Sequence, residues 1–120
     1  MKIARLLAGI LLLSISFSFA QNTYPSIGKV IRNSPQLDAL LATDAKIEVL
    51  ASGFIWAEGP VWVKDGGYLL FSDVPQNTVF KWNAKEGLTT FLNPSGFTGA
   101  GKYGDEPGSN GLTLDSQGRL

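Results

Sequence analysis

Glu58 and Asn110 are the residues whose types and spacing point most directly to chemistry. Each is a polar residue followed by glycine, and they lie 52 positions apart. A carboxylate and an amide supply oxygen ligands, which suit a hard divalent cation such as Ca²⁺, Mg²⁺ or Mn²⁺. The sequence has no cysteine and no histidine, so thiolate ligands, imidazole ligands and a histidine-based triad are excluded within it. In the alternative interpretation, Glu58 caps a turn and Asn110 forms an Asx turn.

The segments around these two residues resemble each other. Residues 58–69 align with residues 110–120 when one gap is placed at Gly67. Both copies contain a polar residue, a glycine, a short strand, a glycine-containing turn and a leucine. A repeat of about 40 to 50 residues with four strands per unit is typical of a β-propeller. Because the first strand of each propeller blade lines the central channel, we expect Glu58 and Asn110 to face the same cavity.

Four short strands that would position these residues are predicted, at 61–63, 68–72, 78–82 and 88–92. Asp-Gly and Gly-Gly between the first two favour the positive φ of a tight hairpin. A four-strand meander of this length matches one propeller blade. The glycine-rich loop 93–109 that follows is long for a compact domain, and we leave open whether it is functional or a surface excursion.

The segment before the strands predicts less regular structure. Residues 21–45 are interpreted as a leader with one short helix. Ser34 and Pro35 are typical of a helix start, and the helix is expected over 36–43 with its leucines on one face. Alternating apolar and polar residues predict a strand over 47–51. The domain itself is assigned to residues 46–120.

Residues 1–20 have the pattern of an export signal. Lys2 and Arg5 precede an apolar run, and small residues before Gln21 indicate cleavage after Ala20. The run is short for a membrane anchor, which is the alternative. We therefore expect a bacterial periplasmic or secreted protein with no stable membrane association after cleavage. This segment holds 14 apolar residues and accounts for the positive mean hydropathy of +0.10. Residues 21–120 carry 8 basic and 10 acidic residues, which argues against binding nucleic acid through charge.

Several motifs in order resemble the SMP-30/gluconolactonase/LRE family. They are FIWAEGPVW at 54–62, LFSDVP at 70–75, FKW at 80–82, NGLTLD at 110–115 and GRL at 118–120. The resemblance implies an all-β, six-bladed propeller that hydrolyses sugar lactones. A ring of six blades needs roughly 250 to 300 residues. The chain is therefore expected to be an N-terminal fragment that covers about the first blade and the start of the second.

The same resemblance assigns roles to two residues. It implies that Glu58 is a ligand of a divalent cation, with Ca²⁺ expected and Mg²⁺, Mn²⁺ or Zn²⁺ as alternatives. It places Asn110 at the substrate-side asparagine near the metal. The remaining metal ligands and the general base are expected beyond Leu120. Some members have an arginine at the position of Gly108, so their sugar preference does not transfer to this chain.

The expected reaction is attack of water on the cation-polarised carbonyl of a sugar lactone. Among the carboxylates in view, Asp73 is interpreted as a turn former, and Asp105 and Glu106 as solvated loop charges. Trp56 is expected to pack between blades, and stacking of a sugar ring on it is the alternative. Two other functions stay open, a ligand-binding propeller with a structural cation and a phosphotriesterase-like hydrolase. The sequence does not define the oligomeric state or the particular lactone. The fragment itself is expected to be inactive.

The signal interpretation predicts a defined mature N-terminus. When the whole protein is produced with its natural leader in a bacterium, we expect intact-mass spectrometry of the periplasmic fraction to show a chain that starts at Gln21. Recovery of the protein in the membrane fraction with Met1 to Ala20 still attached would contradict cleavage and favour the anchor.

Overall fold

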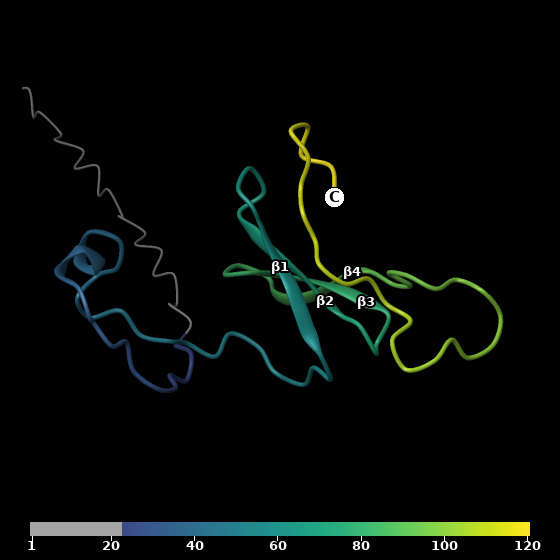
Figure 1. Ribbon diagram of the computed structural model, residues 1–120, viewed down its shortest axis with the longest axis horizontal. Helices are drawn as coiled ribbons and strands as arrows, with labels where there is room; N and C mark the ends of the chain where they lie inside the picture. Colours follow the sequence, from purple (N-terminus) through teal and green to yellow (C-terminus); the bar gives the residue numbers. More distant parts are fainter. Residues whose placement is uncertain (1–22) are drawn as a thin grey trace, which may run out of the picture.

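The computed structural model describes residues 23–120 and shows one four-stranded antiparallel sheet (Figure 1). Its strands follow chain order and are β1 (Ala57–Val63), β2 (Tyr68–Asp73), β3 (Thr78–Asn83) and β4 (Gly87–Leu92). All four predicted strands are present, and β1 begins four residues earlier than expected. The all-β prediction is confirmed, and the meander is consistent with one propeller blade.

The predicted export signal lies outside the residues that the structure describes. Over the described part, 23–120, no helix is both long and apolar enough to cross a membrane.

Local hydrogen bonds explain the tight turns of the sheet. In the first hairpin, the Gly67 N–H donates to the Val63 carbonyl at 2.9 Å, and Gly67 has a φ of +62° that favours glycine. In the turn between β3 and β4, the Asn83 side-chain oxygen accepts from the N–H groups of Lys85 and Glu86. A hydrogen bond from the Asn83 amide is the main cause that holds the pKa of the Glu86 carboxyl below its ordinary value. The hydrogen bond and positive charge of Lys81 lower this pKa further.

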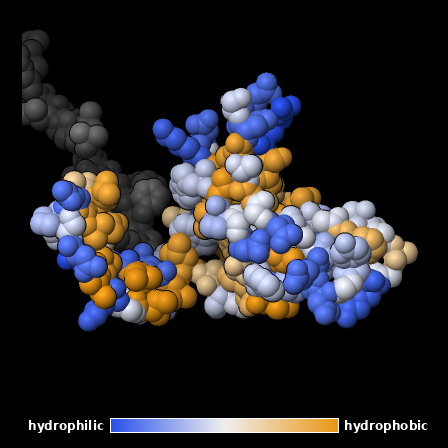
Figure 2. All heavy atoms as spheres, in the orientation of Figure 1, coloured by the Kyte–Doolittle hydropathy of each residue, from blue (hydrophilic) through white to orange (hydrophobic). Residues whose placement is uncertain are grey.

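The core of the described chain is small and centres on β2 and β3. Leu70, Val74 and Val79 are almost fully buried. Phe54, which precedes β1, packs its ring edge-on against Phe71 with centroids 4.9 Å apart. Apolar atoms gather over the sheet and on the segment beside it, whereas the turn near the C-terminus is hydrophilic (Figure 2). Burial of the phenylalanines therefore fixes the approach of the chain to β1.

The leader helix is shorter than predicted. Ser34 caps it as expected, since its side chain accepts from the Gln36 N–H, and Pro35 opens it. The element is a single 3₁₀ segment, η1 (Pro35–Ala39), instead of a helix over 36–43. Leu40 is 83% exposed, so its apolar side chain gains no packing from a second turn. Short helices need such packing to be stable, which explains the early end.

The predicted strand over 47–51 is wrong. The structure has only an isolated antiparallel bridge between Ser26 and Glu48. Two backbone bonds flank it, from the Ile27 N–H to the Ile47 carbonyl and from the Val49 N–H to the Pro25 carbonyl. No further strand in the described chain lies alongside to extend this pairing, so the alternating pattern is not converted into a sheet.

The second copy of the repeat reproduces the turn but not the strand. Residues 110–114 form no strand in the described chain. The Gly118 N–H then donates to the Asp115 carbonyl, and Gly118 has a φ of +76°. In the first copy, the Gly67 N–H likewise donates to the Val63 carbonyl, and Gly67 also has a positive φ. Gly118 thus corresponds to Gly67, and the missing residue falls earlier in the turn than the gap placed at Gly67. The hydrogen bond from the Arg119 backbone N–H is the main cause that lowers the pKa of the Asp115 carboxyl, and the hydrogen bond from the Arg119 guanidinium lowers it further.

Asp73 links the end of β2 to the segment that enters β1. It is fully buried, and its carboxylate accepts from the backbone N–H groups of Ile55 at 2.9 Å and Trp56 at 3.2 Å. The Gln76 side-chain amide donates to the same carboxylate. These bonds use the carboxylate for structure. Only the bond from Gln76 lies within the turn, as expected of a turn former, whereas the other two reach the segment that enters β1.

Loss of this carboxylate should destabilise the whole protein. We expect Asp73→Ala to lower the free energy of unfolding by about 2–4 kcal/mol, because two partly buried N–H groups lose their acceptor. Asp65→Ala, in an exposed hairpin turn, is the matched control and should change it by less than about 0.5 kcal/mol. Urea unfolding followed by tryptophan fluorescence measures both. Equal midpoints for the two variants would contradict the role given to Asp73.

Candidate functional site

Glu58 lies near the start of β1, beside an irregularity in the strand. It pairs with Ser72 of β2, whereas the next pair is Val61 with Leu70, so Gly59 and Pro60 together oppose one residue. This is a β-bulge, where a proline without an N–H is tolerated and a glycine can take its φ of +60°. The sequence Glu-Gly-Pro thus positions Glu58 at the point where regular pairing stops.

The Glu58 carboxylate is available for a ligand. The residue is half-buried, and its side chain makes no hydrogen bond or ion pair within residues 23–120. Asn110 is exposed, and its side-chain amide is likewise without a protein partner across that part of the chain. Two oxygen-bearing side chains therefore remain free at this end of the sheet.

The backbones that carry these two side chains are in contact. A Cβ atom added to Gly59 would lie 2.7 Å from the Gly111 Cα and 3.0 Å from the Asn110 carbonyl oxygen. Any larger residue at position 59 would push the two segments apart. A Cβ added to Gly111 would instead meet open space. The two segments therefore lie in direct backbone contact, and this contact requires the glycine at 59 and not the one at 111.

Ser72 belongs to the candidate site, and the sequence prediction missed it. It is fully buried on β2 and pairs in register with Glu58. Its hydroxyl donates to the Asn110 carbonyl at 2.8 Å. The Ser72 and Ser109 hydroxyl oxygens are 2.9 Å apart. Since Ser72 has already donated its proton, Ser109 is the donor in that contact. Ser72 thus holds the backbone of Asn110 beside the strand that carries Glu58.

The loop 93–109 is fastened at both ends to the turn between β2 and β3. The Asn77 side-chain oxygen accepts from the N–H groups of Ser95 at 2.9 Å and Gly96 at 2.8 Å. Its amide donates to the Phe97 carbonyl at 2.8 Å. At the other end, the Gly108 N–H donates to the Val74 carbonyl at 2.9 Å. The loop therefore projects from the same end of the sheet as Glu58 (Figure 1).

The packing of Gly108 explains why no larger side chain stands there. A Cβ at this position would lie 2.6 Å from the Val74 carbonyl oxygen and 3.0 Å from the Asn77 Cα. An arginine at this place, as in some relatives by resemblance, would require a different course of the loop. Sugar recognition by such an arginine is thus incompatible with the loop seen here.

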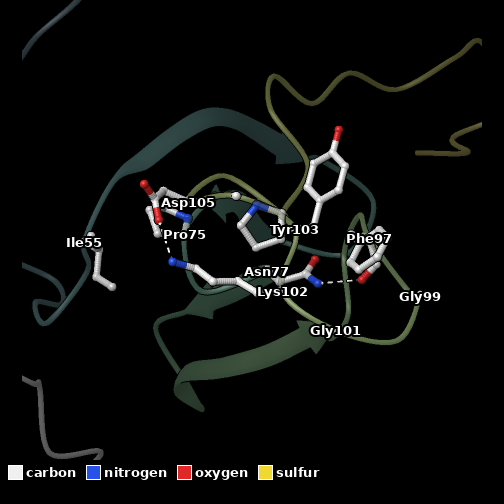
Figure 3. Close-up of a pocket in the computed structure, with 11 residues that line it drawn as sticks. Ile55, Pro75, Asn77, Phe97, Gly99, Gly101, Lys102, Tyr103 and Asp105 are labelled. Carbon is white, nitrogen blue, oxygen red and sulfur yellow. Dashed lines mark hydrogen bonds and ion pairs between the residues drawn. The ribbon is translucent and has the colours of Figure 1, made fainter.

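A cavity of about 620 Å³ opens under this loop (Figure 3). Ile55, which precedes β1, and Pro75 and Asn77 of the turn between β2 and β3 form one wall, and loop residues including Phe97 and Tyr103 close it. Glu58 and Asn110 do not line it. Asp105 does, but it is exposed and forms an ion pair with Lys102 at 3.1 Å. The cavity and the two free oxygen ligands therefore share one end of the sheet without sharing residues.

The residues that the structure describes could supply only part of a metal site. Within the described range 23–120, no group of three His, Cys, Asp or Glu side chains is arranged to hold a metal ion. Glu58 and Asn110 offer one carboxylate and one amide oxygen, donors that fit a hard cation. Any full coordination shell would need further ligands or waters.

The contact at Gly59 can be tested apart from its backbone conformation. Gly67→Ala introduces a side chain at nearly the same φ, +62° against +60°, but into open space. We expect it to cost about 1–2 kcal/mol of unfolding free energy. Gly59→Ala should cost about 1–3 kcal/mol more, because its Cβ collides with the Gly111 backbone. Denaturant unfolding of the whole protein gives both values, and equal losses would mean that the two segments are not in contact.

Comparison with known proteins agrees with the resemblance of the motifs. The SMP-30/Gluconolactonase/LRE-like region matches residues 56–120. A curated relative named gluconolactonase, from Zymomonas mobilis subsp. mobilis (strain ATCC 31821 / ZM4 / CP4), is 48% identical over 98 residues, which cover 79% of this chain and 27% of the relative. The chain thus spans about a quarter of that protein's length. No solved structure gives a significant match. The chain belongs to the SMP-30/gluconolactonase/LRE-like family.

Proposed function

We propose that the whole protein hydrolyses a sugar lactone with the help of a divalent cation, with Ca²⁺ as the expected ion. The observation that carries the proposal is the half-buried Glu58 carboxylate, which has no hydrogen-bond or ion-pair partner in residues 23–120 and lies on the strand that contacts Asn110. The 48% identity to a protein named gluconolactonase supports lactone hydrolysis as the reaction class.

Glu58 and Asn110 would hold the cation from two neighbouring segments. The carboxylate supplies negative charge, and the amide oxygen completes the shell or orients the substrate. When bound, a divalent cation supplies Lewis-acid stabilisation of the negative charge that develops on a carbonyl oxygen. The contact between Gly59 and Gly111 sets how closely the two ligands approach, and Ser72 fixes the backbone of Asn110.

Hydrolysis of a lactone requires water to add to the carbonyl carbon and the ring C–O bond to break. One proton of the water ends on the released ring oxygen as a hydroxyl group and the other is released, so the products are a hydroxy carboxylate and a proton. A base must accept the proton of the attacking water. Asp73 does not fit this role, since it is fully buried and already accepts three hydrogen bonds. Asp105 is exposed and paired with Lys102. We therefore assign the base to neither of them.

The proposal extends to where the protein works. The signal pattern in residues 1–20 supports export to the periplasm or the medium. A small neutral lactone would reach such an enzyme without a nucleic-acid or membrane partner. This location is inferred from the sequence pattern and is tested by the mature N-terminus.

Removal of the Glu58 charge should impair activity and Ca²⁺ binding, whereas removal of a charge in the loop should not. In the whole protein, we expect Glu58→Gln to lower kcat/KM for D-glucono-1,5-lactone by at least about 100-fold and to weaken Ca²⁺ binding in calorimetry. Glu106→Gln is the matched control, because it removes the same charge from an exposed position that does not line the cavity. It should leave both quantities unchanged.

Three outcomes would contradict the proposed function. Activity that survives a chelator would remove the cation from the reaction. Ca²⁺ binding without turnover of any lactone would favour a binding protein with a structural ion. Faster hydrolysis of an organophosphate triester than of any lactone would favour a phosphotriesterase-like enzyme.

A further inference from the structure

The loop 93–109 presents an aromatic pair to the cavity beneath it. The rings of Phe97 and Tyr103 stack with centroids 4.8 Å apart and an interplanar angle of 23°. Gly99 makes room for this arrangement, since a Cβ there would lie 2.5 Å from the Phe97 ring. Tyr103 remains 58% exposed although one of its faces is covered. The loop thus holds an aromatic surface open at the cavity.

The base of the loop keeps this aromatic pair in place. The Phe97 N–H donates to the Pro107 carbonyl at 2.7 Å, which closes the loop across its neck. The Asn77 amide donates to the Phe97 carbonyl at 2.8 Å. Phe97 is thereby tied to the turn between β2 and β3 on one side and to the returning loop on the other. An aromatic surface positioned before a ligand arrives loses less conformational entropy on binding.

The charges of the cavity indicate what kind of ligand fits it. Lys102 and Asp105 are the charged residues in its lining, and they form an ion pair with each other at 3.1 Å (Figure 3). The lining therefore carries no net charge and offers both donors and acceptors at an exposed position. A phosphate or a polyanion would need unpaired cations, which this lining lacks. A neutral ring with many hydroxyl groups matches it better.

We propose that this cavity binds a sugar ring, with one face of the ring packed on Tyr103 and its hydroxyl groups hydrogen-bonded to Lys102 and Asp105. The C–H groups on a sugar face carry partial positive charge and suit the electron-rich face of an aromatic ring. The proposal rests on the proposed function for the substrate class, and on the loop for the place where the ring binds.

The position of the cavity connects it with the candidate metal ligands. Ile55 in its wall lies three residues before Glu58. Its N–H donates to the Asp73 carboxylate. Pro107 in its lining lies three residues before Asn110. Both segments that carry the candidate ligands thus continue directly from the cavity wall. A sugar held on Tyr103 would be concentrated at the end of the sheet where hydrolysis is proposed.

The test measures sugar binding without requiring turnover. The probe is methyl α-D-glucopyranoside, which has no lactone bond, titrated into the whole protein and followed by NMR. We expect Tyr103→Ala to weaken binding by about fivefold to tenfold. Tyr103→Phe should bind like the unchanged protein because it keeps the ring. Glu106→Gln, in the same loop but outside the lining, should also leave binding unchanged.

A second readout links the site to catalysis. In Tyr103→Ala, we expect KM for D-glucono-1,5-lactone to rise by a similar factor while kcat changes by less than about twofold. Absence of glucoside binding in the unchanged protein, or equal affinity in Tyr103→Ala, would overturn the proposed sugar site. Tyr103-dependent glucoside binding without lactone turnover would support the sugar site and contradict the proposed function, so the two failures can be told apart.

Discussion

Ser72 and Asp73 place a hydroxyl and a carboxylate in the interior at the end of β2, where polar groups must be hydrogen-bonded to be tolerated. Asp73 is satisfied by the backbone that enters β1, and Ser72 by the backbone of Asn110. The partners come from opposite sides in the sequence. The hydrogen bonds that satisfy these two buried side chains therefore bring the segment before Glu58 and the segment at Asn110 to one end of the sheet.

The strands were predictable because their signals are local. Short apolar runs separated by Asp-Gly, Gly-Gly and Pro-containing turns predict a meander, and the sheet has the predicted order. The leader was predicted less well, because a helix over 36–43 and a strand over 47–51 both depend on packing partners. Leu40 stays exposed and Glu48 pairs only with Ser26. Sequence periodicity shows which face could be buried, not whether another surface is there to cover it.

The candidate site was predictable to the extent that the repeat revealed it. Alignment of Glu58 with Asn110 predicted their proximity, and the contact of Gly59 with Gly111 places their backbones together. Ser72 and Asn77 were missed, since a serine in a strand and an asparagine in a turn have ordinary local explanations. Their side chains bond to residues that lie 38 and 20 positions away, respectively. Such long-range bonds leave no periodic signal in the sequence.

The long loop gains a structural explanation from the same end of the sheet. Asn77 and Gly108 fasten its two ends, so a segment with many glycines has a fixed base and holds Phe97 and Tyr103 together. Glu58 and the backbone of Asn110 are both joined to Ser72 of β2, and the cavity lies beside them, under the loop that the turn after β2 fastens.

The most direct measurement is anomalous diffraction from crystals of the whole protein soaked with Mn²⁺, which replaces Mg²⁺ or Ca²⁺ at oxygen sites. If Glu58 binds the metal, the distance from the anomalous peak to a Glu58 carboxylate oxygen should be ~2.0 to ~2.6 Å, the range from Mg²⁺ to Ca²⁺ ligand distances. Asn110 should lie in the same coordination shell or beside it. A fully occupied Mn²⁺ peak elsewhere, with the Glu58 carboxylate out of reach, would contradict the proposed site.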